Sequence, residues 1–306
     1  MADNSNFNIE SKSISKSVKT NSDNILSICA LTDGRIATST FCEVVIYNLE
    51  KDKVDMVINE NIEEVSHLFL MQNGYLFSSA CEECIIYDIK ENSYEIIQKL
   101  GGIEGDTTKS IELDNGNIIS LNRGLYIFQK DPALNFYSLL KYIKEDQFLN
   151  DIIQINSDKF ITSNYQEGQI KFWSTKDYSI LIKVDGIKVG PYNNCLYKLD
   201  SQNMLIGGVE NIYLLDINTC NIKKKIDNSY QVFAICPIND KIFLTTGNEG
   251  TITQWKYEND DIIKEHEKEN LAKEEVLCMK YLDNGKILLG DSKNLINVIL
   301  SIFFQI

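Results

Sequence analysis

The stretch Phe160-Ile-Thr-Ser-Asn-Tyr-Gln-Glu-Gly-Gln-Ile-Lys-Phe-Trp173 indicates the fold. Its first three residues suit a β-strand. Residues 164–168 are turn formers, because glycine reaches positive φ without a Cβ clash. The last four residues alternate so that side chains go to both faces of a pleated sheet. The stretch therefore predicts a strand, a polar turn and a second strand.

Degraded copies of this stretch run the length of the chain. The first apolar residue after each turn recurs about every 42 residues, as does the large residue near the end of the following strand. The first set is Ile36, Leu76, Ile118, Phe160, Met204, Ile242 and Ile287; the second is Tyr47, Tyr87, Phe128, Trp173, Leu215, Trp255 and Ile299. Two sets of positions thus give one period, seven times. The turns Asp33-Gly34, Asn73-Gly74, Asn115-Gly116 and Asn284-Gly285 favour φ > 0.

Each repeat has room for four strands. In the first repeat the candidates are residues 25–31, 35–39, 44–48 and 54–58. A four-stranded sheet alone would leave two apolar faces in water, whereas a ring of such sheets packs each between two neighbours. We therefore predict an all-β fold, a seven-bladed β-propeller of four-stranded antiparallel blades. Trp173 and Trp255, at matching positions, are predicted to lie in the core between blades.

Several strand endings resemble the Trp-Asp ending of WD-repeat proteins: Ile46-Tyr47-Asn48, Ile86-Tyr87-Asp88, Phe172-Trp173-Ser174 and Leu215-Asp216. The resemblance covers residues 24–301. No Gly-His dipeptide occurs and no Trp precedes Asp, so the family's His–Asp hydrogen-bond network is missing. Kelch propellers, with a period near 50 and paired glycines, are the structural alternative. The WD-repeat resemblance implies a non-catalytic scaffold that binds a protein or peptide partner on its top face.

The seventh repeat has three candidate strands, at 276–282, 286–290 and 295–301. WD-repeat rings usually complete one blade with a strand from the other terminus, so the resemblance implies ring closure by residues 9–19. We accordingly divide the chain into an N-terminal tail, 1–23, that includes this strand, and a propeller, 24–306. Residues 131–144 are predicted to be an outer strand, with a short helix as the alternative. Residues 265–275, rich in Lys and Glu, are predicted to be a solvated loop or helical turn.

The composition limits the kinds of partner that we expect. The net charge is −14, and of 30 basic residues only Arg35 and Arg123 are arginine, which argues against nucleic acid as a ligand. We expect no secretion leader and no membrane span. Of the eight cysteines, Cys29, Cys195, Cys236 and Cys278 fall in apolar first strands and are read as reduced, buried thiols. The sequence predicts a cytoplasmic or nuclear protein.

The sequence offers few groups for catalysis. His67 is predicted to be a satisfied structural histidine on a first strand, and His266 an exposed one in the charged loop. Cys81-Glu-Glu-Cys84 is the one compact metal-like motif, but structural zinc needs four ligands, so no metal and no cofactor are predicted. The alternative function is a propeller enzyme with an acidic metal-dependent or lyase/hydrolase-type site at the central channel. Its carboxylates would be Glu64, Asp106 and Glu275.

The resemblance also locates a candidate binding face, because partners of WD-repeat rings commonly dock where the innermost strands begin. Counting back seven residues from the last residue of each first strand gives a top-face set of Asn24, Glu64, Asp106, Phe148, Tyr192, Gln231 and Glu275. Aromatic residues are enriched at interface hot spots, and clustered carboxylates favour a basic partner. Phe148 and Tyr192 are therefore predicted to anchor a basic protein or peptide, with the three carboxylates steering it.

Overall fold

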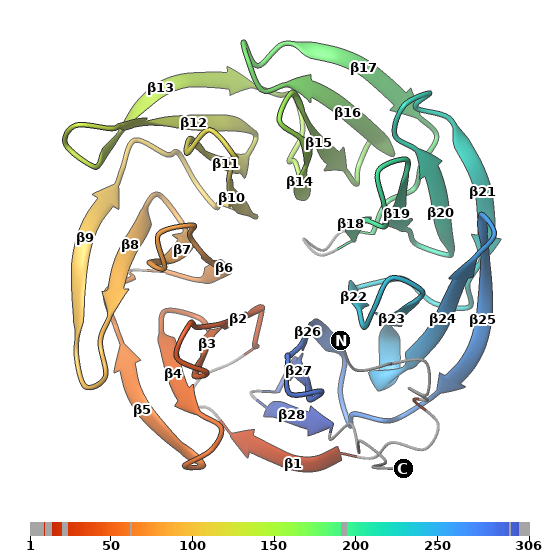
Figure 1. The fold of residues 1–306 in the computed structure, drawn as a ribbon, viewed down its shortest axis with the longest axis horizontal. Helices are drawn as coiled ribbons and strands as arrows, with labels where there is room; N and C mark the ends of the chain where they lie inside the picture. The colour runs from red at the N-terminus through yellow and green to blue at the C-terminus, as the bar shows by residue number, and fades with distance from the viewer. Residues whose placement is uncertain are drawn as a thin grey trace. The chain divides into compact units, whose positions relative to one another are not determined.

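The computed structural model describes residues 9, 14–19, 24–61, 63–190, 195–293 and 295–299. These residues form seven four-stranded antiparallel sheets, here called blades 1 to 7 in chain order (Figure 1). Among the named elements of the described residues, all are strands except the 3-10 helix η3 (Asn248–Gly250). The chain divides into two compact units, a four-blade unit, Leu26–Gly186, and a three-blade unit, Met1–Ile25 with Ile187–Ile306.

In the four-blade unit, each blade is built from four strands that are consecutive in the sequence. Blade 1 contains β2 (Ser27–Ala30), β3 (Ile36–Ser39), β4 (Val44–Asn48) and β5 (Lys53–Ile58), and blade 2 contains β6 (Val65–Leu70), β7 (Leu76–Ala80), β8 (Cys84–Ile89) and β9 (Tyr94–Leu100). Blade 3 contains β10 (Ser110–Glu112), β11 (Ile118–Asn122), β12 (Gly124–Asp131) and β13 (Phe136–Lys144), and blade 4 contains β14 (Asp151–Asn156), β15 (Lys159–Asn164), β16 (Gln169–Ser174) and β17 (Ile180–Asp185).

In the three-blade unit, one blade takes a strand from a distant part of the sequence. Blade 5 contains β18 (Leu196–Lys198), β19 (Asn203–Gly207), β20 (Asn211–Asp216) and β21 (Ile222–Asp227), and blade 6 contains β22 (Ala234–Pro237), β23 (Ile242–Thr246), β24 (Ile252–Glu258) and β25 (Asp261–Lys268). Blade 7 contains β26 (Val276–Tyr281), β27 (Ile287–Asp291) and β28 (Leu295–Ile299), and its fourth strand is β1 (Ile14–Lys19), which pairs antiparallel with β28.

The N-terminal strand is shorter than the 9–19 predicted. β1 begins at Ile14, and residues 10–13 lie outside the described residues. Ile9 is buried in the apolar cluster of blades 6 and 7, and its N–H donates to the side-chain oxygen of Gln254 at 2.8 Å. The N-terminal segment therefore contributes a core side chain to the three-blade unit as well as a strand.

The predicted turn glycines have the backbone conformation that their sequence indicates. Gly34, Gly74, Gly116 and Gly285 have φ between 80° and 85°. In each turn the side chain of the Asp or Asn before the glycine accepts a hydrogen bond from the N–H of the residue that follows the glycine. Asp and Asn suit these turns because their short side chains bond to the backbone two residues on.

The apolar core lies between adjacent blades. Trp173 is 1% exposed and packs in a cluster that combines blades 3 and 4, and Trp255 is 0% exposed in a cluster of blades 5 and 6. The indole of Trp173 stacks on Phe160, with ring centroids 5.9 Å apart, and that of Trp255 stacks on Phe243 at 6.3 Å. The prediction that both tryptophans belong to the inter-blade core is confirmed.

A β-bulge recurs in the outer strands of blades 1 to 6. In each of these blades, two consecutive residues of the third strand pair with outer-strand residues that are separated by one extra residue. That extra residue is the bulge. The bulged residues are Asp55, Ile97, Leu140, Leu181, Lys223 and Glu265. Bulges bend a strand and interrupt its pairing, so they protect an exposed sheet edge from further strands.

The predictions for residues 131–144 and 265–275 have different outcomes. The outer strand expected within residues 131–144 is confirmed as β13, although Asp131 still belongs to β12. The loop or helical turn predicted at 265–275 is wrong in its first part, because β25 continues to Lys268, and His266 is half-buried opposite Gln254. An outer strand meets water along one edge, so a Lys/Glu-rich sequence is compatible with it. Within the described residues, no helix is long and apolar enough to cross a membrane.

Candidate functional site

The predicted top-face residues are distributed over both units. Glu64, Asp106 and Phe148 precede the inner strands of blades 2, 3 and 4, in the four-blade unit. Asn24, Gln231 and Glu275 belong to the three-blade unit, and Tyr192 lies outside the described residues. Phe148 and Gln231 are half-buried; the carboxylates and Asn24 are exposed. The site is therefore described within the four-blade unit, where Glu64 and Asp106 come together.

Four residues at the turns of blades 2 and 3 form what we call the strand-start cluster: Glu63, Glu64, Cys81 and Asp106. One oxygen or sulfur atom each from Glu63, Cys81 and Asp106 lies within 4.8 Å of the others. The Glu82 N–H donates to the Gly105 carbonyl at 3.1 Å, which holds the two turns together. Partial burial, and then the Asp106 charge, raises the pKa of Glu64. Negative charge is thus concentrated at this end of blades 2 and 3.

Cys81 is the only sulfur in this cluster. Desolvation, a hydrogen bond to Asp106 and the surrounding carboxylates raise the pKa of its thiol to about 12. A divalent cation that used Glu63, Cys81 and Asp106 as ligands would have to displace that proton. Cys84 is fully buried and lies 3.6 Å from the Ser120 hydroxyl instead. Cys81 and Cys84 therefore do not act as one pair.

Phe148 is already in contact with a cation of its own chain. The Arg123 guanidinium carbon lies 4.7 Å from the centre of the Phe148 ring, a geometry typical of a cation–π interaction. Arg123 itself is exposed. The predicted aromatic anchor thus has one face covered, and a partner would have to use its other face or displace Arg123.

Three residues after Glu64, Asp106 and Phe148 lie His67, Lys109 and Asp151. They form a polar row that the sequence analysis did not predict. Lys109 Nζ lies 2.6 Å from Asp151 Oδ1, and the Asp151 side chain is 0% exposed. His67 is buried, and its Nδ1 has no hydrogen-bond partner within the described part of the chain. His67 is therefore not the satisfied histidine that the sequence predicted. The same repeat count from Glu64, Asp106 and Phe148 would have located all three residues.

His67 makes the stability of the fold sensitive to acid. Burial, and then the positive charge of Lys109, holds the pKa of His67 well below its ordinary value. Above pH 6.5 the histidine is neutral in both the folded and the unfolded chain and contributes no pH dependence. Below pH 6.5 the unfolded chain binds a proton that the folded chain does not, so stability falls by up to about 1.4 kcal/mol per pH unit.

We expect His67→Gln to flatten this dependence. Urea unfolding of both proteins at pH 7.5, 6.5 and 5.5 measures the difference, and His266→Gln, on the half-buried β25 histidine, is the matched control. The wild type and His266→Gln should lose stability in parallel between pH 6.5 and 5.5, with His67→Gln losing less. Equal slopes for all three proteins would show that His67 is protonated in the folded state.

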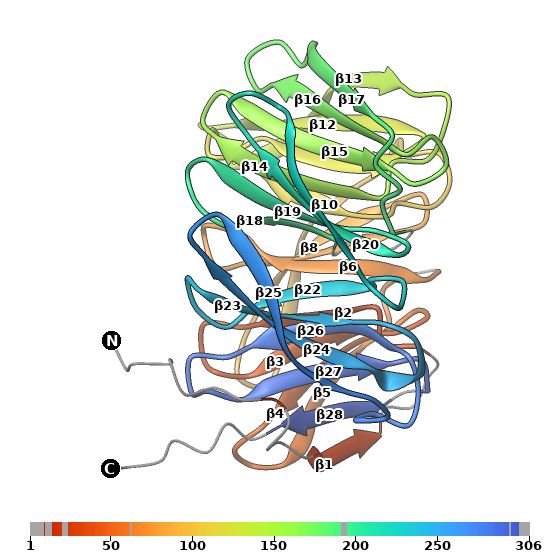
Figure 2. The ribbon, with the colours of Figure 1, turned by 90° about the vertical axis from the view of Figure 1, so that its right-hand side faces the viewer.

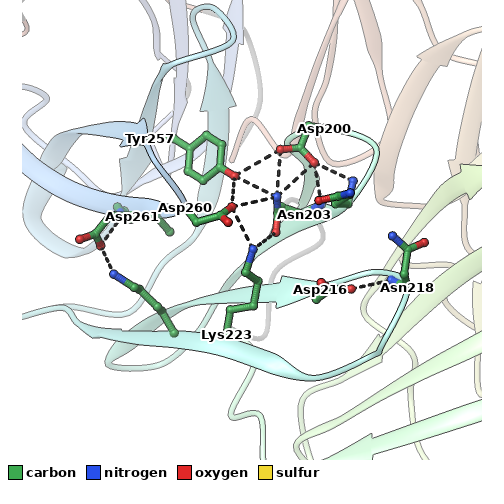
Figure 3. Close-up of polar contacts among 11 residues, drawn as sticks. Asp200, Asn203, Asp216, Asn218, Lys223, Tyr257, Asp260 and Asp261 are labelled. Atoms are coloured by element: carbon green, nitrogen blue, oxygen red, sulfur yellow. Dashed lines mark hydrogen bonds and ion pairs between the residues drawn. The ribbon is translucent and has the colours of Figure 1, made fainter.

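A second polar cluster joins blades 5 and 6 and is self-contained. Figure 3 shows Asn203 among Asp200, Tyr257 and Lys223. The Asn203 amide nitrogen donates to Asp200 Oδ2 at 3.0 Å and to the Tyr257 oxygen at 2.9 Å, and Lys223 Nζ donates to the Asn203 oxygen at 3.0 Å. Lys223 also pairs with Asp260 at 2.9 Å. These groups satisfy one another, so the cluster holds the two blades together.

The contacts within this cluster shift the pKa values of Asp200, Asp260 and Tyr257. Burial acts to raise the pKa of Asp200, but hydrogen bonds from Asn203 and from the backbone outweigh it and lower that pKa. The hydrogen bond from Lys223, followed by that from Tyr257, lowers the pKa of Asp260. Burial and the two aspartates raise the pKa of Tyr257.

Comparison with known proteins bears on the fold alone. No family model and no curated protein matches the chain. A chain in a solved structure described as "Crystal Structure of Mitotic Checkpoint Complex" matches with a TM-score of 0.79 and 12% sequence identity, over 95% of this chain and 92% of that one. This chain is a seven-bladed β-propeller. The prediction of seven four-stranded antiparallel blades is confirmed, and membership of the WD-repeat family stays a prediction.

Two of the blades contain internal side-chain hydrogen bonds between polar residues other than His and Asp. In blade 2, Asn61 accepts a hydrogen bond from the Ser78 hydroxyl at 3.1 Å and donates to the Tyr87 oxygen at 3.3 Å. In blade 6, the hydroxyls of Tyr230 and Thr245 lie 2.8 Å apart, and Thr245 accepts from the Trp255 indole N–H at 2.8 Å. The absence of Gly-His dipeptides therefore does not leave these two blades without internal hydrogen bonds.

Proposed function

We propose that this propeller is a non-catalytic protein-interaction scaffold, and that the strand-start cluster binds a Lys/Arg-rich segment of a partner protein. The observation that carries this proposal is the meeting of Glu63, Glu64 and Asp106, from two adjacent blades, at one end of the four-blade unit. Within the described residues these three carboxylates form no ion pair. Unpaired clustered carboxylates attract a basic segment and speed its association.

Other features of the chain support the same proposal. Its fold is similar to that of a chain in a mitotic checkpoint complex, which is a protein assembly. The net charge of −14 favours a basic partner over nucleic acid or an anionic membrane surface. All eight cysteines are free, which suits the reducing cytoplasm or nucleus. Phe148, whose ring lies against the Arg123 guanidinium, is proposed to extend the surface within the four-blade unit.

Neutralising the cluster should abolish binding of a basic peptide. The triple variant Glu63→Gln/Glu64→Gln/Asp106→Asn is compared with the control Glu91→Gln/Glu95→Gln/Asp114→Asn, which changes the net charge equally at exposed sites of blades 2 and 3. A fluorescent 12-residue Lys/Arg-rich peptide is titrated by anisotropy. We expect the cluster variant to weaken binding at least tenfold, and the control at most threefold. Raising salt from 50 to 300 mM should slow association.

Two results would contradict the proposal. Equal losses in the two triple variants would mean that the peptide responds to net charge and not to this cluster. The alternative function, an acidic metal-dependent enzyme, is favoured by the three converging donors Glu63, Cys81 and Asp106. A thermal stabilisation by Zn²⁺ that Cys81→Ser removes, with no peptide binding, would replace the scaffold proposal with that alternative.

A further inference from the structure

Two neighbouring outer strands of the four-blade unit each expose at least three large apolar side chains. On β13 these are Leu139, Leu140 and Tyr142, and on β17 they are Ile180, Leu181 and Ile182. We call these six residues the rim patch. The other outer strands differ: β21, for example, follows Ile222 with three consecutive lysines. Several exposed large apolar side chains close together in the sequence are a candidate interaction site.

The bulged residues of blades 3 and 4 are both apolar and exposed, whereas blade 2 carries the half-buried Ile97. In blades 1, 5 and 6 the bulged residue is charged: Asp55, Lys223 or Glu265. In blades 3 and 4 it is leucine, and Leu140 and Leu181 are 48% and 46% exposed. A charged bulge discourages a further strand or an apolar partner. Blades 3 and 4 carry the bulge without the charge.

The two strands form one surface. Figures 1 and 2 both show β13 and β17 as neighbours at the outside of the four-blade unit. Lys141 Nζ on β13 donates to the Asp177 carbonyl, in the turn before β17, at 3.3 Å. The Tyr142 ring stacks on Tyr126 of β12, with centroids 4.4 Å apart, which fixes its position in the patch.

β13 is the last strand of its sheet, so alternate backbone N–H and C=O groups point away from β12. At Tyr137 both backbone groups are already bonded to the Gln98 side chain. The Tyr137 N–H donates to Gln98 Oε1 at 2.9 Å, and Gln98 Nε2 donates to the Tyr137 carbonyl at 2.6 Å. Beyond Tyr137, no strand of the described residues pairs with this edge. Because the bulge at Leu140 interrupts the regular alternation of the edge, the part open to an added strand is residues 141–144.

The charge of the edge decides which kind of segment fits it. From Phe136 to Lys144 there is no carboxylate, but there are two lysines, Lys141 and Lys144. Neither Lys144 nor Lys183 of β17 makes an ion pair with any described residue. Pairing with the β13 of a second copy would place lysines near lysines, which opposes self-association through this edge.

We propose that the β13 edge accepts an extended, apolar and acidic segment of a partner protein as an added strand. The segment's backbone pairs with residues 141–144, beyond the bulge at Leu140. Its apolar side chains cover the rim patch, and its carboxylates meet Lys141 and Lys144. Main-chain pairing supplies affinity in this mode of recognition, and alternate side chains supply specificity. The surface is distinct from the strand-start cluster, so this proposal does not depend on the proposed function.

The test begins with a phage-displayed library of random 12-residue peptides, selected on the full chain and counter-selected on Leu140→Lys/Leu181→Lys. We expect the enriched peptides to alternate apolar residues with Asp or Glu. Their synthetic, labelled forms are then titrated by anisotropy. Leu140→Lys should weaken binding at least tenfold and Lys144→Glu at least threefold. The matched controls, Ile263→Lys on β25, where Ile263 is also 48% exposed, and Lys225→Glu on β21, should change it less than twofold. Thermal unfolding of each variant verifies that it is folded.

Backbone methylation of the peptide separates strand addition from side-chain docking. Two versions are made, N-methylated at the odd or at the even positions. We expect one version to lose binding and the other to keep it, because an added strand turns only alternate N–H groups toward β13. Equal binding of both versions, enrichment of basic peptides, no enrichment at all, or peptides that bind Leu140→Lys normally would each overturn the proposal. A dimer of the free chain that Leu140→Lys dissociates would do the same, since a second copy would then occupy the edge.

Discussion

Trp173→Ala should lower the free energy of unfolding by about 3–5 kcal/mol, the range for removing a fully buried aromatic side chain. The indole is 1% exposed and packs with residues of both blade 3 and blade 4. Its N–H also donates to the Thr162 hydroxyl at 2.9 Å, so alanine leaves a cavity and removes a hydrogen-bond donor. Trp255→Ala should cost a similar amount, because Trp255 has the same stacking and the same bond to a threonine, Thr245.

Urea unfolding measures both variants. Trp173→Phe keeps most of the apolar area and should cost much less, with about 1 kcal/mol of the loss due to the missing hydrogen bond. Tyr165→Ala, which truncates a 42% exposed ring in the same blade, is the surface control and should stay within about 0.5 kcal/mol of the wild type. If Trp173→Ala costs less than about 1 kcal/mol and abolishes peptide binding instead, the residue belongs to a ligand site and not to the core.

The repeat could be predicted from the sequence because two independent signals fall on the same period. The glycines at 34, 74, 116 and 285 require turns, and large residues such as Trp173 and Trp255 lie in the third strand of each repeat. Inter-blade packing requires both at a fixed spacing, so the repeat is visible without any WD-repeat signature residue. The bulges leave no such trace, since an extra residue such as Leu140 reads as one more residue of the strand.

The candidate site was less predictable because its contacts join residues far apart in the sequence. Counting from strand ends located Glu64 and Asp106, which the structure brings together. It did not locate Cys81, which reaches Asp106 from the turn of another blade, or Arg123, which covers Phe148. The composition of residues 265–275 predicts a solvated loop or helical turn because it suits water, but an outer blade strand meets water as well, and β25 continues to Lys268.

Asp151→Ala should destabilise the chain by about 3–5 kcal/mol, because it removes the buried carboxylate that lies beside the Lys109 ammonium. Lys109 Nζ lies 2.6 Å from Asp151 Oδ1, and the two side chains are only 13% and 0% exposed. Water therefore cannot replace the carboxylate without a rearrangement of the inner strands. The exposed pair Lys224–Asp261, with both side chains at least 40% exposed, is the control; Asp261→Ala should cost less than about 1 kcal/mol.

The double variant Lys109→Met/Asp151→Leu tests whether the cost comes from an unpaired charge. Replacing a buried ion pair by apolar residues of similar volume is often neutral, so the double variant should be more stable than Asp151→Ala in urea unfolding. It should also weaken the acid sensitivity caused by His67, because the positive charge of Lys109 contributes to the low pKa of that histidine. If the double variant is no more stable than Asp151→Ala, the ion pair is not the reason for the loss. The polar row would then be held by other contacts of Asp151.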